Sequence, residues 1–387
     1  IFSSLTSDVV NYDYDNNLLT VSSEVFEGSA WGGVQEVDIQ AINDGGSMGV
    51  THMSIAVTGF SGLTSEDFWG NTATFNVYTT YSGISEIKVR YRYSGDTSWS
   101  SYMTAEQVSS NTWSVQNTSE WSEGTNGSGL TIYNLTRGIL PSKDYEVQIS
   151  IDGVESDIAE VTSSATTQTV TYGNLNDSSM SCFTTSNSGS TSWASGNNST
   201  TSSLCTYFSS GNYAGVYMKT TSAAGVLAAG NLFTGVFSMS GTLNSTGNAS
   251  FGQAFEWLAR PTSLKVTYKA APRSDDKGRV FIALVDWSSR QTVSVNGLSS
   301  TVSGIWDPET TDSVISDNDI IGYGSVLFGE TTSDFAEVTV PINYYNKITK
   351  PDNTYTIVIS CTASYKGDYL EGTEDSELWI DNIEFGY

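Results

Sequence analysis

The sequence predicts an all-β protein that contains two antiparallel β-sandwiches, of which the second is the larger. Three observations lead to this fold class. Glycine (36 residues) and tyrosine (21) are frequent while proline (6) is rare. Apolar residues alternate with polar ones in many short runs, and no stretch keeps a helical period for more than a turn or two. Such alternation is typical of strands that bury one face.

The length of 387 residues predicts two or three domains, at about 150 residues for each domain. We expect an N-terminal β segment at 1–50, a sandwich at 51–168 and a larger sandwich at 170–387. The N-terminal segment carries strand-like runs near 18–21 and 34–42, but it is short for an independent sandwich. It is either an incomplete domain or an extension of the next one.

The alternation is clearest in the first sandwich, between residues 51 and 168. Ile87 and Val89 alternate with basic residues, as expected of a half-buried strand in a two-sheet sandwich. The stretch NLTRGILPSKDYEV (134–147) resembles the E–F corner of a fibronectin type III or immunoglobulin-like domain. That resemblance implies that the Tyr145 hydroxyl caps the turn, and that the domain serves as a spacer or a docking module.

The larger domain carries five apolar runs that predict core strands, and we interpret it as a jelly-roll-like sandwich. These runs lie at 264–268, 280–285, 335–342, 355–361 and 378–385. In the last run the pair Asp381–Asn382 interrupts the alternation, which predicts a β-bulge. A polar and aromatic loop without any period, around residues 365–375, precedes this closing strand.

The charge balance excludes one class of partner. The formal net charge is −26, from 42 acidic and 16 basic residues, and such a charge repels phosphate backbones, so we expect no nucleic acid partner. No apolar run approaches the roughly 20 residues that cross a bilayer. Because the chain begins at Ile1 rather than Met, we expect that a signal or lipid-anchor segment has been removed, and that membrane attachment would use that anchor only.

Histidine and cysteine usage limits the chemistry. The single histidine, His52, lies in a strand-like run, which argues against a Ser-His-Asp or Cys-His hydrolase and against a His-ligated metal site. Any catalysis would therefore use carboxylates. Cys361 lies in an apolar run and is expected to be a buried thiol. Cys182 and Cys205 flank a segment rich in serine and asparagine, and they either pair in an oxidising compartment or remain free.

Several motifs of the larger domain follow one another in an order that carries a resemblance. They are WASGN (193–197), AAGNLFTG (228–235), FGQAFEWLARPTSLK (251–265), IALVDW (282–287), SYKGDY (364–369) and LWIDNIEF (378–385). Together they resemble the putative carbohydrate metabolism domain of lipoproteins from polysaccharide-degrading Gram-negative bacteria. The resemblance implies a jelly-roll akin to carbohydrate-binding modules and a glycan ligand. It also implies an extracytoplasmic lipoprotein of polysaccharide utilisation, on the outer-membrane surface or facing the periplasm, and it assigns no reaction.

Sugar-binding sites combine flat aromatic rings, which stack on the C–H faces of a sugar, with polar groups that bind its hydroxyls. The larger domain carries such residues at turn-like positions. Our candidates for glycan contacts are Asp286, Trp287, Trp306, Tyr365, Asp368 and Tyr369. Ordinary packing is the alternative for each ring.

Acidic residues cluster in the C-terminal loop, at Asp368, Glu371, Glu374 and Asp375. A glycosidase needs two carboxylates across one bond, but a solvated acidic loop is the simpler interpretation of this cluster. Calcium is another use of carboxylate oxygens. The likeness to carbohydrate-binding jelly-rolls implies a structural Ca²⁺ at Asp381 on the final strand, with Asp177 as its partner.

Three functions are consistent with these observations. The first is a non-catalytic surface lipoprotein that binds a polysaccharide or other glycan through the C-terminal jelly-roll. The second is an adhesin or protein-interaction module that binds other surface proteins, which a long unpaired edge strand would favour. The third and least favoured is a carboxylate glycoside hydrolase, which would require two acids in a deep cleft.

Overall fold

The structure, a computed structural model, describes most of the chain after residue 57 and parts of the chain before it. The described residues are 10–13, 18–21, 35–43, 46–55, 58–80, 83–185, 192–223, 225–298, 301–303, 319–347 and 349–387. Their regular structure consists of β-strands and short 3-10 helices, which confirms the all-β prediction. Within this described part, no helix is long and apolar enough to cross a membrane.

Two antiparallel hairpins form the described part of the N-terminal segment. The first pairs β1 (Val10–Asp13) with β2 (Leu18–Val21), and the second pairs β3 (Gln35–Asn43) with β4 (Gly46–Ile55). Strands β2 and β3 lie where the alternation predicted them.

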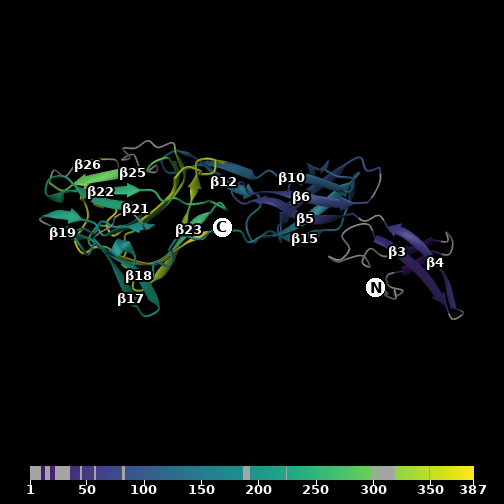
Figure 1. Ribbon diagram of the computed structural model, residues 1–387, viewed down its shortest axis with the longest axis horizontal. Helices are drawn as coiled ribbons and strands as arrows, with labels where there is room; N and C mark the ends of the chain where they lie inside the picture. Colours follow the sequence, from purple (N-terminus) through teal and green to yellow (C-terminus); the bar gives the residue numbers. More distant parts are fainter. Residues whose placement is uncertain are drawn as a thin grey trace. The chain divides into compact units, whose positions relative to one another are not determined.

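The chain divides into two compact units (Figure 1). The smaller unit comprises 1–66, 73–117 and 142–163, and the larger comprises 67–72, 118–141 and 164–387. The chain thus enters the larger unit at two early segments before it stays there from residue 164 onward. The domain boundary expected from the sequence, at residues 168–170, places these two segments in the first sandwich. Their contacts instead lie in the larger unit.

Besides the two N-terminal hairpins, the described part of the smaller unit contains two antiparallel sheets. One has the strand order β5 (Thr58–Asp67), β6 (Thr72–Thr79), β10 (Thr112–Gln116) and β9 (Glu106–Gln107). The other has the order β14 (Val154–Glu155), β13 (Asp144–Ile151), β7 (Ile87–Tyr93) and β8 (Met103–Thr104), with β15 (Ala159–Thr162) also paired to β13. Alternate residues of β6, β7 and β13 are buried. Tyr145 is fully buried, with its ring 6.0 Å from that of Tyr91.

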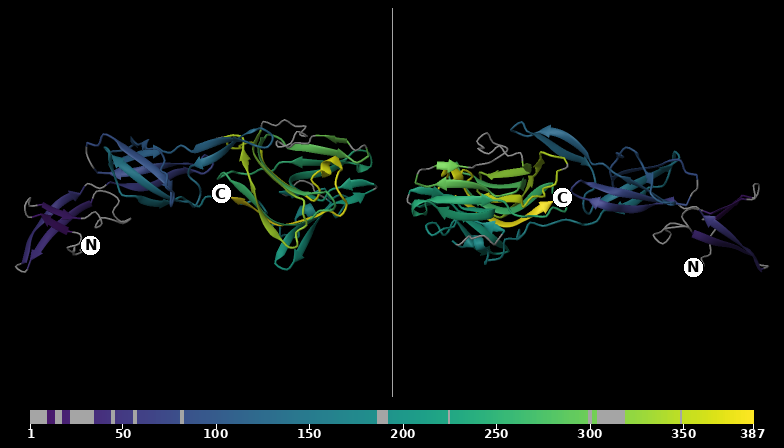
Figure 2. Two further views of the ribbon diagram at one scale, coloured as in Figure 1. Left: turned by 180° about the vertical axis from the view of Figure 1, so that it is seen from behind. Right: turned by 45° about the horizontal axis from the view of Figure 1, so that its top comes forward.

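The larger unit also contains two main sheets, and Figures 1 and 2 show β21, β22 and β25 in one layer and β17 and β18 in the other. The short sheet has the order β17 (Cys205–Ser210), β18 (Tyr213–Lys219), β31 (Glu377–Gly386), β23 (Ser263–Ala271) and β28 (Ala336–Pro341). The closing strand β31 lies in its centre. The register of β31 against β23 shifts between the pairs Thr267–Asn382 and Tyr268–Ile380, so the predicted bulge is confirmed at Asp381.

The long sheet of the larger unit contains the remaining main strands. Their order is β11 (Glu120–Thr125), β12 (Thr131–Arg137), β29 (Asn343–Tyr344), β27 (Ile320–Phe328), β24 (Gly278–Trp287), β30 (Tyr355–Thr362), β21 (Asn231–Ser240), β22 (Thr246–Phe251), β25 (Gln291–Asn296) and β26 (Thr301–Ser303). Strand β16 (Trp193–Ala194) pairs with β21, and β19 (Thr221–Ala223) forms a hairpin with β20 (Val226–Ala228). This two-sheet architecture is consistent with a jelly-roll.

A buried cation joins the early segments to the rest of the larger unit. The guanidinium of Arg260, which is 4% exposed, donates hydrogen bonds to the carbonyl oxygens of Trp69 (2.9 Å), Asn346 (3.1 Å) and Lys347 (2.7 Å). It also lies over the rings of Trp69, Trp121 and Tyr344, at 4.6, 4.9 and 4.8 Å from their centroids. We call these residues the Arg260 cluster. Burial lowers the pKa of Arg260 to about 10, so the group remains charged at neutral pH.

All three cysteines are buried free thiols in this structure. Cys361 is part of the main core, as its apolar run predicted. Burial, followed by the neighbouring Cys182 thiol, raises the pKa of Cys205 well above its ordinary value. The structure therefore contains Cys182 and Cys205 in their unpaired form.

Candidate functional site: a pocket on the long sheet

One face of the long sheet forms the floor of a pocket of about 460 Å³. Such a volume lies within the range of small-molecule sites, which is about 300–1,000 Å³. Strand β21 runs through this floor, and its alternation decides which residues line it: Asn231, Phe233 and Phe237 face the pocket, whereas Leu232 lies in the main core.

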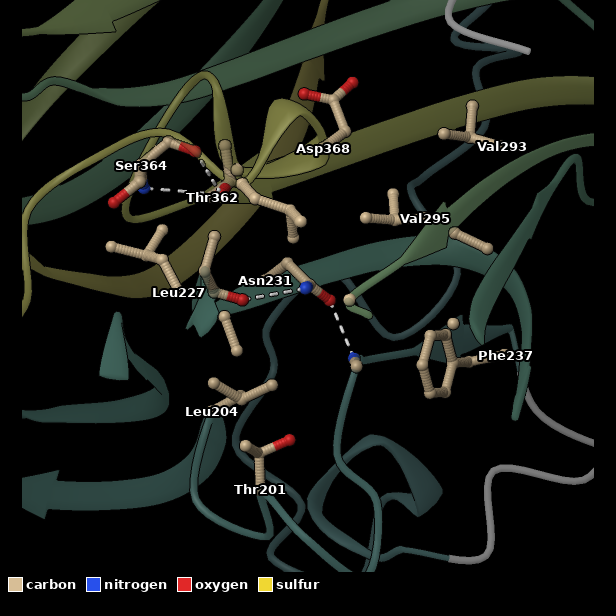
Figure 3. Close-up of a pocket in the computed structure, with 18 of the residues that line it drawn as sticks. Thr201, Leu204, Leu227, Asn231, Phe237, Val293, Val295, Thr362, Ser364 and Asp368 are labelled. Carbon is tan, nitrogen blue, oxygen red and sulfur yellow. Dashed lines mark hydrogen bonds between the residues drawn. The ribbon is translucent and has the colours of Figure 1, made fainter. Parts of the chain in front are cut away.

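The first half of β21 contributes a polar half of the floor. There Asn231 lies opposite Thr362 on β30, and Thr362 lies opposite Arg279 on β24. Phe233 and Ser360 form the next row. The Arg279 guanidinium donates to the Ser325 hydroxyl at 3.0 Å and to the Tyr323 hydroxyl, so its position is fixed. Asn231 is also held, since its amide oxygen accepts from Gly196 N at 2.7 Å and its amide nitrogen donates to Ala229 O at 2.9 Å (Figure 3).

The second half of β21 contributes an apolar half of the floor. At Gly235 the strand exchanges its partner β30 for β22. Gly235 has a φ of 153°, and a Cβ there would lie 2.2 Å from the Ser250 carbonyl oxygen, so only glycine permits this close approach. Beyond it, Phe237 and Met239 of β21 share the pocket face with Val293 and Val295 of β25.

The C-terminal loop, residues 364–370, forms one wall of the pocket. Its base is fixed by the buried Asp276, whose carboxylate accepts hydrogen bonds from the Ser364 hydroxyl (2.6 Å) and the Thr373 N–H (2.9 Å). Gly367 lies so close to Ala229 that a Cβ there would be 2.2 Å from the Ala229 Cβ. The loop therefore packs directly against the segment that precedes β21.

The opposite walls come from two other segments of the larger unit. Residues Thr201 and Leu204 line the pocket from the loop before β17, and Val226 and Leu227 line it from the β19–β20 hairpin. Figure 3 shows Asn231 between these walls, with Ser364 and Asp368 on one side of it and Phe237 on the other.

The pocket brings together three of the six residues that the sequence indicated for glycan contacts. Tyr365, Asp368 and Tyr369 all line it, and each is partly exposed. Tyr369 also packs against the second hydrophobic cluster of the long sheet. The motif that predicted these residues thus contributes a wall of this pocket.

Two of the other three candidates, Trp287 and Asp286, do not line this pocket. Trp287 is 1% exposed and belongs to the second hydrophobic cluster, so the expectation of a displayed ring is wrong here. A ring with both faces packed cannot stack on a sugar. Asp286 accepts the N–H groups of Asp352 (3.1 Å) and Asn353 (2.8 Å) and thereby holds the turn before β30. Trp306 lies outside the described residues.

The two carboxylates expected to bind calcium both accept hydrogen bonds from protein groups. Asp381 accepts the Ala214 N–H at 2.7 Å, and Asp177 accepts the N–H (2.8 Å) and hydroxyl (2.6 Å) of Ser179. The Ser179 hydrogen bonds lower the pKa of Asp177. Within the described part of the chain, no three histidine, cysteine or acidic residues group closely enough to hold a metal. Asp177 therefore stabilises its own turn, and Asp381 holds the backbone of the neighbouring strand β18.

Sequence reasoning missed the pocket floor. Asn231, Arg279, Phe237 and Val295 come from strands that are distant in sequence, and only the register places them together. One signal was available: glycine inside a strand-like run, as at Gly235, often marks the close approach of a backbone or a ligand.

Comparisons with known proteins agree with the family that the motifs indicated. The model of a family described as putative carbohydrate metabolism domain matches residues 167–385. Two solved structures are similar, both of them putative glycoside hydrolases at 17% identity. The first, from Bacteroides thetaiotaomicron VPI-5482, has a TM-score of 0.39 over 67% of this chain and 86% of that chain. The second, from Bacteroides vulgatus ATCC 8482, has a TM-score of 0.38 over 69% and 95%.

A comparison with curated proteins finds no match. The family model covers more than half of the chain, and its limits fall within the segment 164–387 of the larger unit. The chain therefore belongs to the putative carbohydrate metabolism domain family.

Proposed function

We propose that the larger unit binds a glycan in the pocket on its long sheet, without cleaving it. The observation that carries this proposal is the grouping of Tyr365, Asp368 and Tyr369 beside the polar half of the floor. Aromatic side chains offer apolar faces to the C–H groups of a sugar, and carboxylate, amide and hydroxyl groups bind its hydroxyls. Membership of a carbohydrate-related family supports a glycan as the ligand.

The charges of the pocket favour binding over hydrolysis. Among the described residues that line it, Asp368 is the one carboxylate, and Arg279 and Lys366 are the cations. A glycosidase uses two carboxylates that flank the scissile bond. Because this lining supplies one, it suits recognition, and its positive balance accommodates neutral sugars or sugars that carry a carboxylate.

The location is part of the same proposal. We place the protein outside the cytoplasm, as a lipid-anchored protein of the outer-membrane surface, because the resemblance to the carbohydrate-related family implies that location. Binding to another surface protein is the competing function, and it would use a surface other than this pocket.

Affinity electrophoresis of the whole chain tests this function. The whole chain is required because residues 67–72 and 118–141 belong to the larger unit. Gels loaded with neutral and uronate-containing polysaccharides should retard the protein in one class, and Tyr365→Ala or Asp368→Ala should abolish the retardation. The matched control is Tyr102→Ala, an aromatic of the smaller unit whose hydroxyl donates to Glu155. Equal migration in every gel would contradict the proposal, as would retardation that both pocket variants retain.

A further inference from the structure

The apolar half of the pocket floor is a trough along β22. The strand register places Ala249 between Phe237 and Val293, and it places Gly247 between Met239 and Val295. Small residues on the middle strand and larger ones on both neighbours leave a groove between two apolar ridges. A Cβ on Gly247 would lie 3.3 Å from the Phe237 ring, so this ring packs over Gly247 and forms one side of the trough.

Two exposed leucines extend the trough at its open end. Leu243 is 90% exposed and Leu298 is 70% exposed, and both line the pocket. The turns that carry them are joined, since Gly297 N donates to Ser245 O at 3.0 Å. Exposed apolar groups that are contiguous with a pocket mark interaction sites more often than isolated ones do.

The backbone that carries Leu243 is strained. Leu243 has a φ of 59° and the next residue, Asn244, has a φ of 53°. A left-handed conformation is unfavourable for leucine, and strain of this kind is concentrated at ligand sites. The turn thus holds an apolar side chain toward solvent, at the rim of an apolar trough, in spite of an unfavourable backbone conformation.

From the two halves of this floor we infer that the pocket takes a glycan that carries an acyl or alkyl group, as a glycolipid does. This inference rests on the glycan-binding function proposed above. The sugar lies over Asn231, Thr362 and Arg279, beside Asp368, and the apolar group lies in the trough along β22.

The chemistry of the trough favours this ligand over an unsubstituted sugar chain. The side chains of Phe237, Val293 and Val295 carry no hydrogen-bonding atom, so a sugar hydroxyl placed there would lose its water without gaining a partner. A methylene group placed there would instead leave water for an apolar surface. The polar half of the floor, in turn, gives no advantage to a lipid without a sugar.

A titration of the whole chain with alkyl β-glycosides, from methyl to octyl and below their micelle-forming concentrations, tests the inference. Glucosides, galactosides and mannosides supply three sugar heads, and octanol supplies the chain without a sugar. We expect affinity to rise about fourfold for each methylene until the trough is filled, from the usual free energy of burying such a group. The best octyl glycoside should bind at least tenfold more tightly than octanol.

The variant Ala249→Leu fills the trough without removing apolar surface, so it should remove the dependence on chain length. Its matched control is Ala159→Leu, the same substitution on β15 of the smaller unit, which should leave that dependence unchanged. A thermal melt of each variant confirms that it is folded.

The outcomes separate this inference from the proposed function. Retardation by a polysaccharide combined with affinity that is independent of alkyl length would overturn the inference and leave glycan binding intact. Octanol binding as tight as the best octyl glycoside would show a purely apolar site, and would overturn both. A dependence on chain length that Ala249→Leu retains would place the alkyl group outside the trough and also overturn the inference.

Discussion

Two places in the larger unit combine an arginine with several aromatic rings. In one place the arginine binds backbone carbonyl groups of the protein itself, and in the other it lines a pocket. In the Arg260 cluster, the guanidinium is buried, donates to three carbonyl oxygens and lies over three rings. In the pocket of about 460 Å³, Arg279 and Tyr369 line the cavity and are partly exposed. The same residue types therefore stabilise the fold in one place and line a binding site in the other. Burial distinguishes the two, since Arg260 is 4% exposed and Arg279 is partly exposed.

The largest expected effect follows from removing the cation of the first cluster. Arg260→Leu leaves three buried carbonyl oxygens without their donor, and each charged hydrogen bond contributes about 1.5–3 kcal/mol. We expect the free energy of unfolding of the larger unit to fall by about 3 kcal/mol or more, measured by urea denaturation. Arg260→Lys should recover only part of this loss, because one ammonium group cannot reach all three carbonyls. A loss below about 1 kcal/mol would mean that the cluster does not stabilise the fold.

A smaller loss of stability, with a loss of binding, is expected from the loop of the pocket. Gly367→Ala places a Cβ 2.2 Å from the Ala229 Cβ, so the loop must move, at a cost of about 1–3 kcal/mol. The displaced wall carries Asp368 and Tyr369, and retardation in polysaccharide gels should disappear. The control is Gly83→Ala in the smaller unit, where a φ of 83° strains the backbone but no atom lies within 4 Å. Its retardation should match that of the parent protein.

The C-terminal tyrosine should give a smaller effect that depends on pH. Tyr387 donates to the Gln168 carbonyl oxygen at 2.9 Å, and burial raises its pKa to about 12 from an ordinary value of 10.0. Below pH 10 the phenol is protonated in both states, so its contribution is complete. Between about pH 10 and 12 the unfolded state ionises first, so the free energy of unfolding falls as the pH rises. Tyr387→Phe should show a shallower decline in alkaline denaturation than the parent. Parallel declines would contradict the assignment.

The smallest effect is expected at the exposed ion pair below the pocket loop. Lys219 Nζ lies 2.7 Å from Asp375 Oδ1, and the hydrogen bond and charge of Lys219 hold the pKa of Asp375 below its ordinary 3.8. The stabilisation from this ion pair is therefore present above the ordinary pKa of 3.8, and it is lost as the pH falls through the lowered pKa of Asp375. The parent protein should therefore lose a little thermal stability between pH 4 and pH 2, and Lys219→Met should lose less. Added salt should reduce this difference between the two proteins. Identical acid profiles would indicate that the pair contributes nothing.

The fold was accessible from the sequence because period-two alternation reports directly which residues share one face of a strand. The closing strand and its bulge at Asp381 were predicted in this way. The early segments of the larger unit could not be placed in this way. The alternation of β12 shows which residues share a face, but it does not show whether the strand pairs with β29 or with a strand of the first sandwich. Local pattern fixes strands, and pairing depends on contacts between distant residues.

The candidate site was predicted in part, for the same reason. The aperiodic loop with Tyr365, Asp368 and Tyr369 could be identified as a displayed, polar segment. Trp287 was misjudged because its place at the end of a strand looked exposed, whereas the long sheet carries a second apolar cluster on that face. The floor of the pocket depends on the register of five strands, which no local pattern specifies.

The central claim is that the pocket is where a glycan binds, and hydrogen exchange of the whole chain tests it most directly. The measurement compares amide exchange with and without the polysaccharide that retards the protein. We predict slower exchange in the loop 364–370 and at the pocket ends of β21, β22 and β25, with no change in the smaller unit. Protection confined to β18 and β31 of the short sheet, where Tyr217 and Trp379 stack at 4.9 Å, or to the smaller unit, would contradict the claim.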